Sequence, residues 1–135
     1  MDARLTWVRI PSPLLMTNKK TFQEVIDSSV RVLRAFQKVE KRPWGAEGAV
    51  IEMVKQIGEL SKLIMVTEGY YMVGRDNLPQ YQSSVEKIGD ELSDIFLMVI
   101  RLADHYAINL EEVHLKEMDI AMNSPLMKVK PAKEK

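Results

Sequence analysis

Residues 84–106 read SVEKIGDELSDIFLMVIRLADHY, and this stretch decides the fold class. Its apolar side chains recur at helical spacing, which predicts a helix from Ser84 to about Tyr106 with one face packed inward. The run from Ile95 to Ile100 is apolar on every side of that helix. Four short helices cannot easily bury such a run on all sides. We therefore expect the chain to associate with further copies of itself. The expected inward face consists of Val85, Ile88, Leu92, Ile95, Phe96, Val99 and Ala103.

Two further helices are predicted before this segment. Thr21 can cap the first, with Glu24 three residues on as its capping-box partner. Its apolar pattern fades near Lys41, and Pro43 ends it. The second helix is expected to begin near Ala46. Its apolar stripe is close to an ideal helical face and consists of Val50, Met53, Val54, Ile57, Leu60 and Ile64.

The remaining segments complete a four-helix pattern. Glycines, a proline and the pair Asp76–Asn77 lie within residues 68–83, which predicts a loop. Asn109 can cap a fourth helix that runs to about Met122. No stretch alternates apolar and polar residues as a strand does, so the sequence predicts an all-α fold of four helices. We expect a helical domain over residues 21–123, an N-terminal arm over 1–20 and a flexible basic tail over 124–135.

The composition excludes several classes of protein. Lys plus Arg and Asp plus Glu both count 19 among 135 residues, so the basic excess of a general nucleic-acid binder is missing. The chain has no cysteine, which excludes a disulfide scaffold, a thiolate zinc site and a Cys nucleophile. No stretch approaches the roughly 20 apolar residues that span a bilayer, and residues 1–15 do not resemble a secretory signal. We therefore expect a cytoplasmic protein that binds neither membranes nor nucleic acid polymers, with its start at Met1 or Met16.

Two polar stripes carry the candidate chemistry. Glu52, Gln56 and Glu59 lie at i, i+4 and i+7 of the second helix, and Glu91 and Asp94 lie three residues apart on the third. Two antiparallel helices can bring these stripes face to face, so that oxygen ligands converge as Mg²⁺ or Mn²⁺ requires. A solvated helix surface produces the same spacing, and this alternative stays open. Basic side chains flank both stripes, as in a site for a metal–phosphate complex, and the candidate substrate residues among them are Lys55, Lys62, Lys87 and Arg101.

The residues of these stripes resemble a known family. Gly58-Glu59-Leu60 and, further along, Asp90-Glu91-Leu92-Ser93-Asp94-Ile95 are similar to the paired motifs EExxE and ExxD of the MazG-like all-α nucleoside triphosphate pyrophosphohydrolases. The segments Leu102–His105 and Ile108–Val113 resemble the junction between the third and fourth helices of that family. The resemblance covers about residues 32–119, which is most of the predicted helical domain.

The resemblance implies both a fold and an activity. The fold is a four-helix MazG-like bundle completed by oligomerisation, as a dimer or a tetramer. The activity is Mg²⁺-dependent hydrolysis of a nucleoside triphosphate to monophosphate and pyrophosphate, in which water attacks the α-phosphorus. Such enzymes are thought to clear non-standard or excess nucleotides. The metal ligands and catalytic residues carried over by position are Glu59, Glu91 and Asp94.

Two positions depart from the family pattern. Lys55 and Gln56 stand where the relatives carry paired glutamates, and Gln56 offers an amide oxygen without a negative charge. Glu52, one turn earlier on the same stripe, is our candidate to supply the negative charge that Gln56 lacks. The relatives often carry Lys-Met-Asp-x-Asn where this chain has Glu117-Met118-Asp119-Ile120-Ala121, so Asp119 remains a candidate substrate residue without its basic and Asn neighbours.

Three functions remain open on the sequence alone. The first is the pyrophosphohydrolase, and the second is a weakened MazG-like protein that binds nucleotides or serves in assembly. The third is a helical interaction protein whose acidic stripes lie on the surface. Trp44, at the turn that enters the second helix, is a candidate platform for a nucleobase. A lid over the hydrophobic core is the alternative role for an aromatic side chain in that place.

Overall fold

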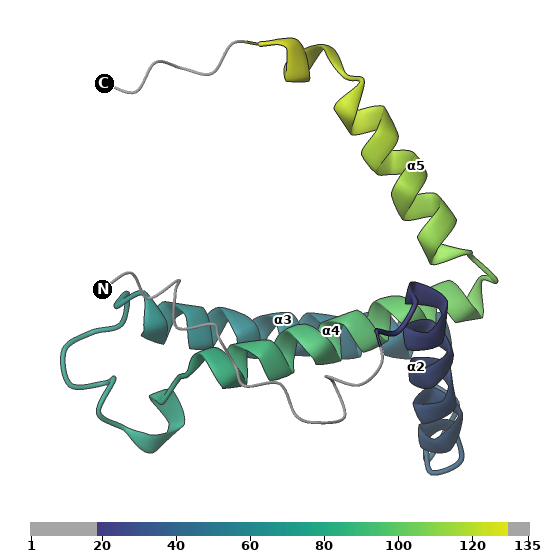
Figure 1. The fold of residues 1–135 in the computed structure, drawn as a ribbon. Helices are drawn as coiled ribbons and strands as arrows, with labels where there is room; N and C mark the ends of the chain where they lie inside the picture. Colours follow the sequence, from purple (N-terminus) through teal and green to yellow (C-terminus); the bar gives the residue numbers. More distant parts are fainter. Residues whose placement is uncertain (1–18, 130–135) are drawn as a thin grey trace.

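The computed structural model describes residues 19–129 (Figure 1). No residue of this range lies in a strand, so the predicted all-α class is confirmed. The predicted N-terminal arm up to residue 18, with its two candidate starts, and the tail from residue 130 lie outside the described residues. The four helices are α2 (Phe22–Gln37), α3 (Gly45–Thr67), α4 (Val85–His105) and α5 (Leu110–Met122), and two 3₁₀ turns are η2 (Pro79–Tyr81) and η3 (Pro125–Lys128).

Side-chain caps fix where three of these helices begin. The Thr21 hydroxyl accepts a hydrogen bond from the Glu24 backbone N–H, and the Glu24 carboxylate accepts one from the Thr21 N–H. This is the predicted capping box. Ser84 caps α4 and Asn109 caps α5 through the same side-chain-to-backbone contact. Helix α3 has no such cap and begins instead at Gly45, whose φ of +61° suits a residue without a side chain.

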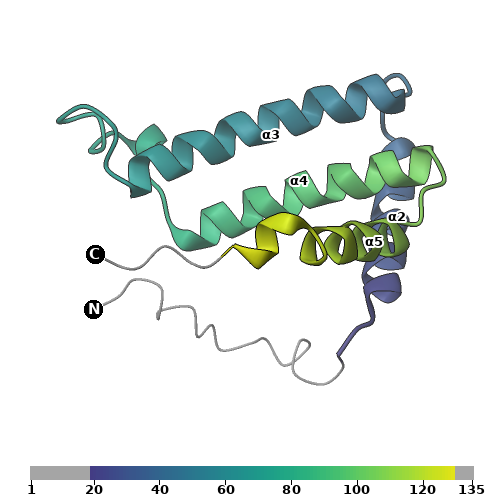
Figure 2. The same ribbon diagram turned by 90° about the horizontal axis from the view of Figure 1, so that it is seen from above.

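Helices α3 and α4 lie side by side and antiparallel, and α2 crosses them at one end (Figure 2). The hydrophobic core lies at that crossing. Its buried members are Leu33 from α2, Ala49 from α3, and Met98 and Ile100 from α4. Since apolar burial is the main stabilising contribution, this crossing fixes the arrangement of the three helices. The far ends of α3 and α4 are joined by the segment that contains η2.

The faces that α3 and α4 turn inward agree only in part with the predicted faces: Ala103 is buried as predicted. Val85, Leu92 and Phe96 of α4 were predicted to be buried, but they are exposed in the single chain. The side chains of α4 that are buried are Met98, Ile100, Arg101 and Ala103. The predicted apolar stripe of α3 is likewise exposed, at Val50, Val54, Ile57 and Ile64. The helical period identified the apolar faces, but it could not tell which of their residues the chain itself buries.

Helix α2 ends at Gln37, earlier than the predicted end near Lys41. The backbone N–H of Lys38 closes it by donating to carbonyls of the last helical turn. The chain then turns through residues 38–44 and carries Glu40 towards α4. The sequence pattern had placed this residue on a helix, so its role was not foreseen.

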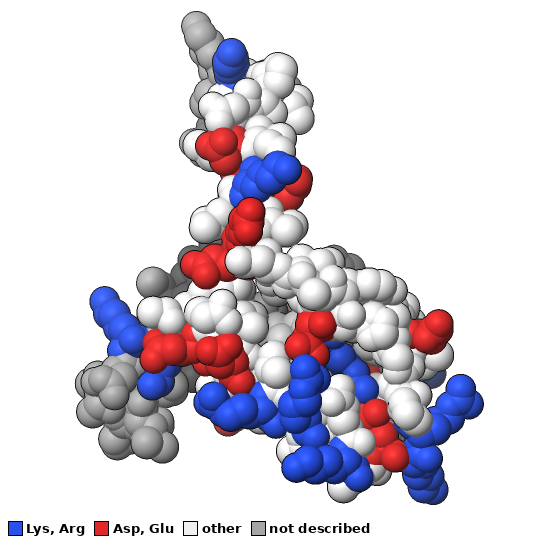
Figure 3. Space-filling model, turned by 90° about the vertical axis from the view of Figure 1, so that its right-hand side faces the viewer, with Lys and Arg blue, Asp and Glu red and all other residues white. Residues whose placement is uncertain are grey.

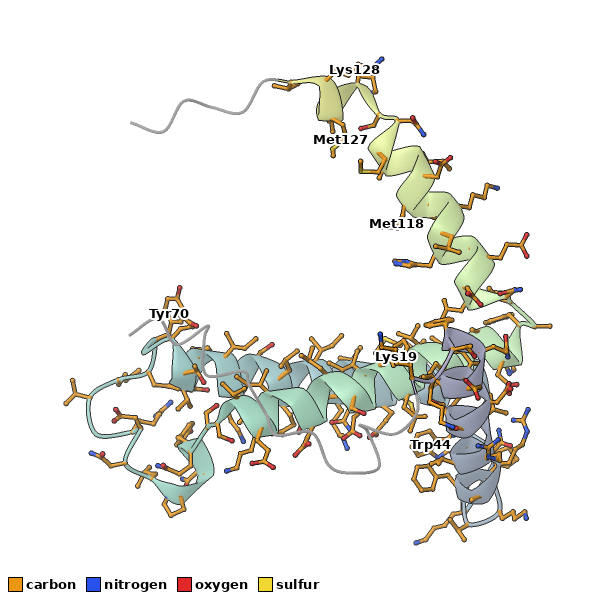
Figure 4. The ribbon with its side chains drawn as sticks, in the orientation of Figure 1. Lys19, Trp44, Tyr70, Met118, Met127 and Lys128 are labelled. Atoms are coloured by element: carbon orange, nitrogen blue, oxygen red, sulfur yellow. The ribbon has the colours of Figure 1, made fainter. Side chains whose placement is uncertain are left out.

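Helix α5 projects from the body formed by α2, α3 and α4 (Figures 1 and 3). Its residues from Glu111 to Met122 are all exposed, and η3 follows within the segment predicted as a flexible tail. Several of the exposed side chains are apolar, among them Val113, Met118 and Ile120. Figure 4 shows that Met118 lies on this arm, apart from the body. The exposed apolar side chains of this helix have no apolar surface to pack against within the described chain.

Acidic and basic side chains are interspersed over the face shown in Figure 3. That face therefore carries no broad patch of positive or of negative charge. Among the described residues, no helix combines the length and the apolar character needed to cross a membrane.

Candidate metal and nucleotide site

The two polar stripes face each other along the seam between α3 and α4. Glu52, Gln56 and Asp94 line one cavity beside this seam. Glu59 and Glu91 line a second cavity further along it. The five residues expected as metal ligands thus share one seam, with three contributed by α3 and two by α4.

Glu91 is the least satisfied of these carboxylates. Its Oε2 atom is buried and has no hydrogen-bond partner among the described residues. Burial raises the pKa of Glu91, and the charges of Asp94 and Glu59 raise it further, while Lys55 acts in the opposite direction. A buried carboxylate oxygen without a partner is costly, and either a proton or a bound cation would relieve that cost.

Glu52 is held by two neighbours on its own helix. Lys55 Nζ lies 2.8 Å from Glu52 Oε1, and Gln56 Nε2 donates a hydrogen bond to the same oxygen at 2.9 Å. The hydrogen bond to Glu52 raises the pKa of Lys55, as do the charges of Glu52, Glu91 and Asp94. Lys55 therefore lies in the field of both stripes. The amide nitrogen of Gln56 is engaged with Glu52, which leaves its amide oxygen as the atom that a cation could use.

The donor atoms on this seam suit a hard divalent cation. Four carboxylates and one amide supply oxygen alone, which is what Mg²⁺ and Mn²⁺ prefer. As they stand, no three Asp, Glu or His side chains between residues 19 and 129 lie close enough together to hold a metal ion. The unpartnered oxygen of Glu91 and the mutual repulsion of Glu59, Glu91 and Asp94 are both features that a cation would relieve. The donor types therefore suit the expected metal, but the described side chains do not converge on one point.

A cavity of about 640 Å³ adjoins the carboxylates at the α2 end of the seam. Apolar walls with a few polar groups are typical of a small-molecule site. Figure 4 shows Trp44 at this end of the molecule. The apolar lining is Phe36, Val39, Trp44, Leu97 and Met98, and the polar lining is Glu40, Lys41, Glu52, Gln56, Asp94 and Arg101.

Arg101 and Glu40 form a buried ion pair in the wall of this cavity. Arg101 Nη2 lies 2.6 Å from Glu40 Oε1, and both side chains are more than nine-tenths buried, at 7% and 8% exposure. The contact is electrostatic rather than an aligned hydrogen bond, because Glu40 Oε1 has no hydrogen-bond partner. The other carboxylate oxygen accepts from the Trp44 backbone N–H at 3.3 Å. Glu40 thus links α4 to the start of α3.

Trp44 is held in place on two sides. Its ring lies 4.9 Å from Arg101 Cζ, close enough for a cation–π contact. On another side Gly48 makes room for it, since a Cβ at that position would come 2.4 Å from the Trp44 Cβ. The aromatic ring is therefore positioned on the cavity wall, and it covers the buried guanidinium of Arg101. The two roles considered for Trp44, platform and lid, are compatible in this arrangement.

The other expected substrate residues lie in two places. Lys62 and Lys87 line the smaller cavity beside Glu59 and Glu91. Asp119 lies on α5, where its carboxylate accepts a hydrogen bond from Asn123, and it does not line either cavity. The described chain therefore brings together the candidate residues of α3 and α4 and leaves Asp119 apart.

Sequence reasoning missed Glu40. A signal for it was present, because Arg101 directly follows the apolar run that ends at Ile100, and a cation in that place needs an acidic partner. The sequence alone could not identify Glu40 as this partner, because Glu40 precedes α3 in the chain whereas Arg101 follows it. Comparisons with protein-family models, with curated proteins and with solved structures found no match for this chain.

Proposed function

We propose that this chain is a divalent-metal-dependent nucleoside triphosphate pyrophosphohydrolase that removes non-standard or excess nucleotides. The observation that carries the proposal is the buried carboxylate oxygen of Glu91, Oε2, which has no hydrogen-bond partner among the described residues and lies in the field of Glu59 and Asp94. Asp94, together with Glu52, lines a cavity with a positioned aromatic wall. The similarity of the same residues to MazG-like motifs supports the same function.

Each group on the seam has a distinct task in this proposal. Glu59, Glu91 and Asp94 hold Mg²⁺, or Mn²⁺ in its place, and Glu52 and Gln56 complete the ligand set. Bound Mg²⁺ offsets negative charge on the triphosphate and on the leaving pyrophosphate.

The cavity at the α2 end takes the nucleoside. Trp44 offers a ring on which a base stacks. The apolar walls from Leu97 and Met98 exclude bulk water, which strengthens electrostatic interactions beside them. Arg101 holds Trp44 in position, and its charge is offset by Glu40. Lys55 contributes positive charge next to Glu52.

A panel of canonical and modified nucleoside triphosphates, incubated with Mg²⁺ or Mn²⁺, tests this function. We expect monophosphate and pyrophosphate in equal amounts, and no turnover after addition of EDTA. Chromatography separates these products from diphosphate and orthophosphate. Release of diphosphate and orthophosphate would contradict the assignment, because it places cleavage at a different bond.

A second candidate function is nucleotide binding without efficient turnover. The observation that favours it is Gln56, which takes the place of a carboxylate and donates its amide to Glu52. The ligand charge is thereby lower than in the family motif, and affinity for a hard cation depends on that charge. Triphosphate binding without hydrolysis in the same panel would select this function.

We also propose that a second copy of the chain covers the open apolar stripes of α3 and α4. Ile57 and Leu92 are 46% and 51% exposed in the single chain, on the stripes that the sequence predicted to be buried. Light scattering at micromolar concentration should report a dimer or a tetramer. Ile57→Glu should shift the mass towards the monomer, because it places a charge in an apolar interface. Ile51→Glu, on a 70% exposed side chain outside these stripes, is the control. A wild-type monomer would contradict this proposal.

A further inference from the structure

A cavity of about 630 Å³ lies where α2, the end of α4 and the start of α5 meet. We call it the junction groove. Its apolar walls consist mainly of Phe22, Ile26, Val30, Ile100, Ile108 and Leu110. The described residues that line it differ from those that line the two cavities beside the carboxylate seam, and they include none of the candidate site residues. The junction groove is therefore a separate feature of the molecule.

The floor of the junction groove is continuous with the hydrophobic core. Ile100 is 1% exposed, and Ile26, Val30 and Leu110 pack against the core while remaining partly exposed. At the rim, Ile108 is 46% exposed. An apolar groove that is open to water is unfavourable, and an apolar occupant would remove that cost.

Charged side chains at the junction groove favour a basic occupant. Asp27, Asp104 and Glu111 line it, together with the basic residue Arg31. Arg34 lies 2.8 Å from Asp104 and offsets the charge of that carboxylate. With Arg34 included, the formal charge of the described residues at the groove is negative by one. An apolar segment with a positive charge therefore suits the groove better than an acidic one.

The N-terminal arm has the composition that this groove requires. Its residues 1–18, which lie outside the described part of the chain, read MDARLTWVRIPSPLLMTN. The large apolar side chains before Met16 are Leu5, Trp7, Val8, Ile10, Leu14 and Leu15. Arg4 and Arg9 outnumber the one acidic residue, Asp2. The prolines between them and Met16 favour extended backbone, which lowers the entropy lost when such a segment docks.

The arm is also joined directly to the wall of the junction groove. Lys19, the first described residue, lies three positions before Phe22, which lines the groove. Along α2 the groove extends from Phe22 to beyond Val30, a rise of roughly 12 Å. About four extended residues cover that distance, so residues 5–15 are long enough to fill the groove. Residues 16–20 remain to reverse the direction of the chain.

We propose that residues 5–15 occupy the junction groove of their own chain. Trp7 is the largest apolar side chain of this segment and anchors it in the groove. The arginines of the arm then lie near the carboxylates of Asp27 and Glu111, where the charge of the groove attracts them.

An occupied groove would also hold α5 in place. The turn between α4 and α5 lines the groove at Ala107 and Ile108. Ala107 has a φ of +52°, which is costly for a residue with a side chain, so contacts around the turn must maintain it. The docked segment covers this turn and thereby fixes the direction in which α5 leaves the body (Figure 1).

Paramagnetic relaxation in the full chain tests this contact. The chain has no cysteine, so Ser12→Cys creates a single attachment point for a nitroxide spin label. The amide signals of Ile26 and Ile108 should weaken in the labelled protein and recover when ascorbate reduces the label. The signals of Thr67 and Ser83, at the far ends of α3 and α4, should not change.

Variants on each side of the contact show what holds the segment. Trp7→Ser should lower the docking equilibrium constant about tenfold or more and restore most of the signal, because an aromatic anchor contributes most to such a contact. Trp7→Phe should retain most of the weakening. Ile108→Ser should restore the Ile26 signal from the groove side. Val73→Ser, on a fully exposed apolar side chain of the loop before α4, is the matched control and should leave the Ile26 signal weak.

A mixture of spin-labelled chains without ¹⁵N and ¹⁵N-enriched chains without label identifies which copy supplies the segment. Weakened groove signals in that mixture would mean that a second copy supplies it, and would overturn the assignment to the same chain. Groove signals that do not respond to the label, or that stay weak in both Trp7→Ser and Ile108→Ser, would overturn the inference as well. Triphosphate hydrolysis is not a readout here, so the result is independent of the proposed function.

Discussion

Replacing Glu91 by Gln is expected to reduce Mg²⁺-dependent hydrolysis by at least about a hundredfold. The substitution keeps the size of the side chain but removes the charge from a carboxylate whose Oε2 atom is buried and unpartnered among the described residues. Mg²⁺ or Mn²⁺ binding, measured by isothermal titration, should weaken in parallel. Glu86→Gln is the matched control, because Glu86 is an exposed residue of α4 that lines neither cavity of the seam.

The same substitution, although it weakens hydrolysis, should increase the stability of the metal-free protein. Because burial and neighbouring carboxylates raise the pKa of Glu91, the folded state disfavours its ionised form. Its contribution to stability is therefore fully present below the ordinary glutamate pKa. It is lost as the pH rises through the raised value. In EDTA at neutral pH, Glu91→Gln should thus have a higher free energy of unfolding than the wild type.

Denaturant unfolding in EDTA and in Mg²⁺ checks both effects. The difference between wild type and Glu91→Gln should shrink as the pH falls towards the ordinary glutamate pKa. Added Mg²⁺ should stabilise the wild type more than the variant, since ligands stabilise the state that binds them. If Glu91→Gln binds Mn²⁺ as tightly as the wild type, Glu91 is not a ligand and the proposed site is wrong.

Replacing Arg101 by Met is expected to lower the free energy of unfolding by about 3–5 kcal/mol, because it leaves Glu40 buried and unpaired. Glu40→Leu should have a comparable effect by leaving Arg101 unpaired. The double variant, Glu40→Leu with Arg101→Met, should be close to the wild type in stability, since no buried charge remains. Urea denaturation of the wild type, the two single variants and the double variant measures the interaction energy between Glu40 and Arg101.

An exposed ion pair provides the control for this cycle. Arg34 Nη1 lies 2.8 Å from Asp104 Oδ2, but the Arg34 side chain is 50% exposed. Arg34→Met should change stability much less, because water solvates half of the Arg34 side chain and the contact is screened. If the losses at Glu40 and Arg101 instead add in the double variant, the two residues act independently and the pair does not organise the cavity.

Much of the helical framework was predictable because its determinants are local. Thr21, Ser84 and Asn109 each lie next to the helix that they cap, and the apolar period marks the helix interior. The polar stripes were predictable for the same reason, since spacing along one helix decides which residues share a face. Their juxtaposition across α3 and α4 needed only that the helices be antiparallel.

The features that escaped prediction depend on contacts between distant segments. Which apolar face is covered depends on what packs against it, so Leu92 and Phe96 were assigned to a core that the single chain does not form around them. Glu40 became part of the site only because α2 ends early and the chain turns back towards Arg101. No local sequence pattern indicates that Glu40 pairs with Arg101.

Hydrolysis of a nucleoside triphosphate in ¹⁸O-labelled water tests the central claim most directly. If this seam carries out attack of water on the α-phosphorus, mass spectrometry will find the label in the monophosphate and none in the pyrophosphate. Label in pyrophosphate would mean attack on the β-phosphorus. Labelled orthophosphate with diphosphate would mean attack on the terminal phosphorus, and either result would contradict the account.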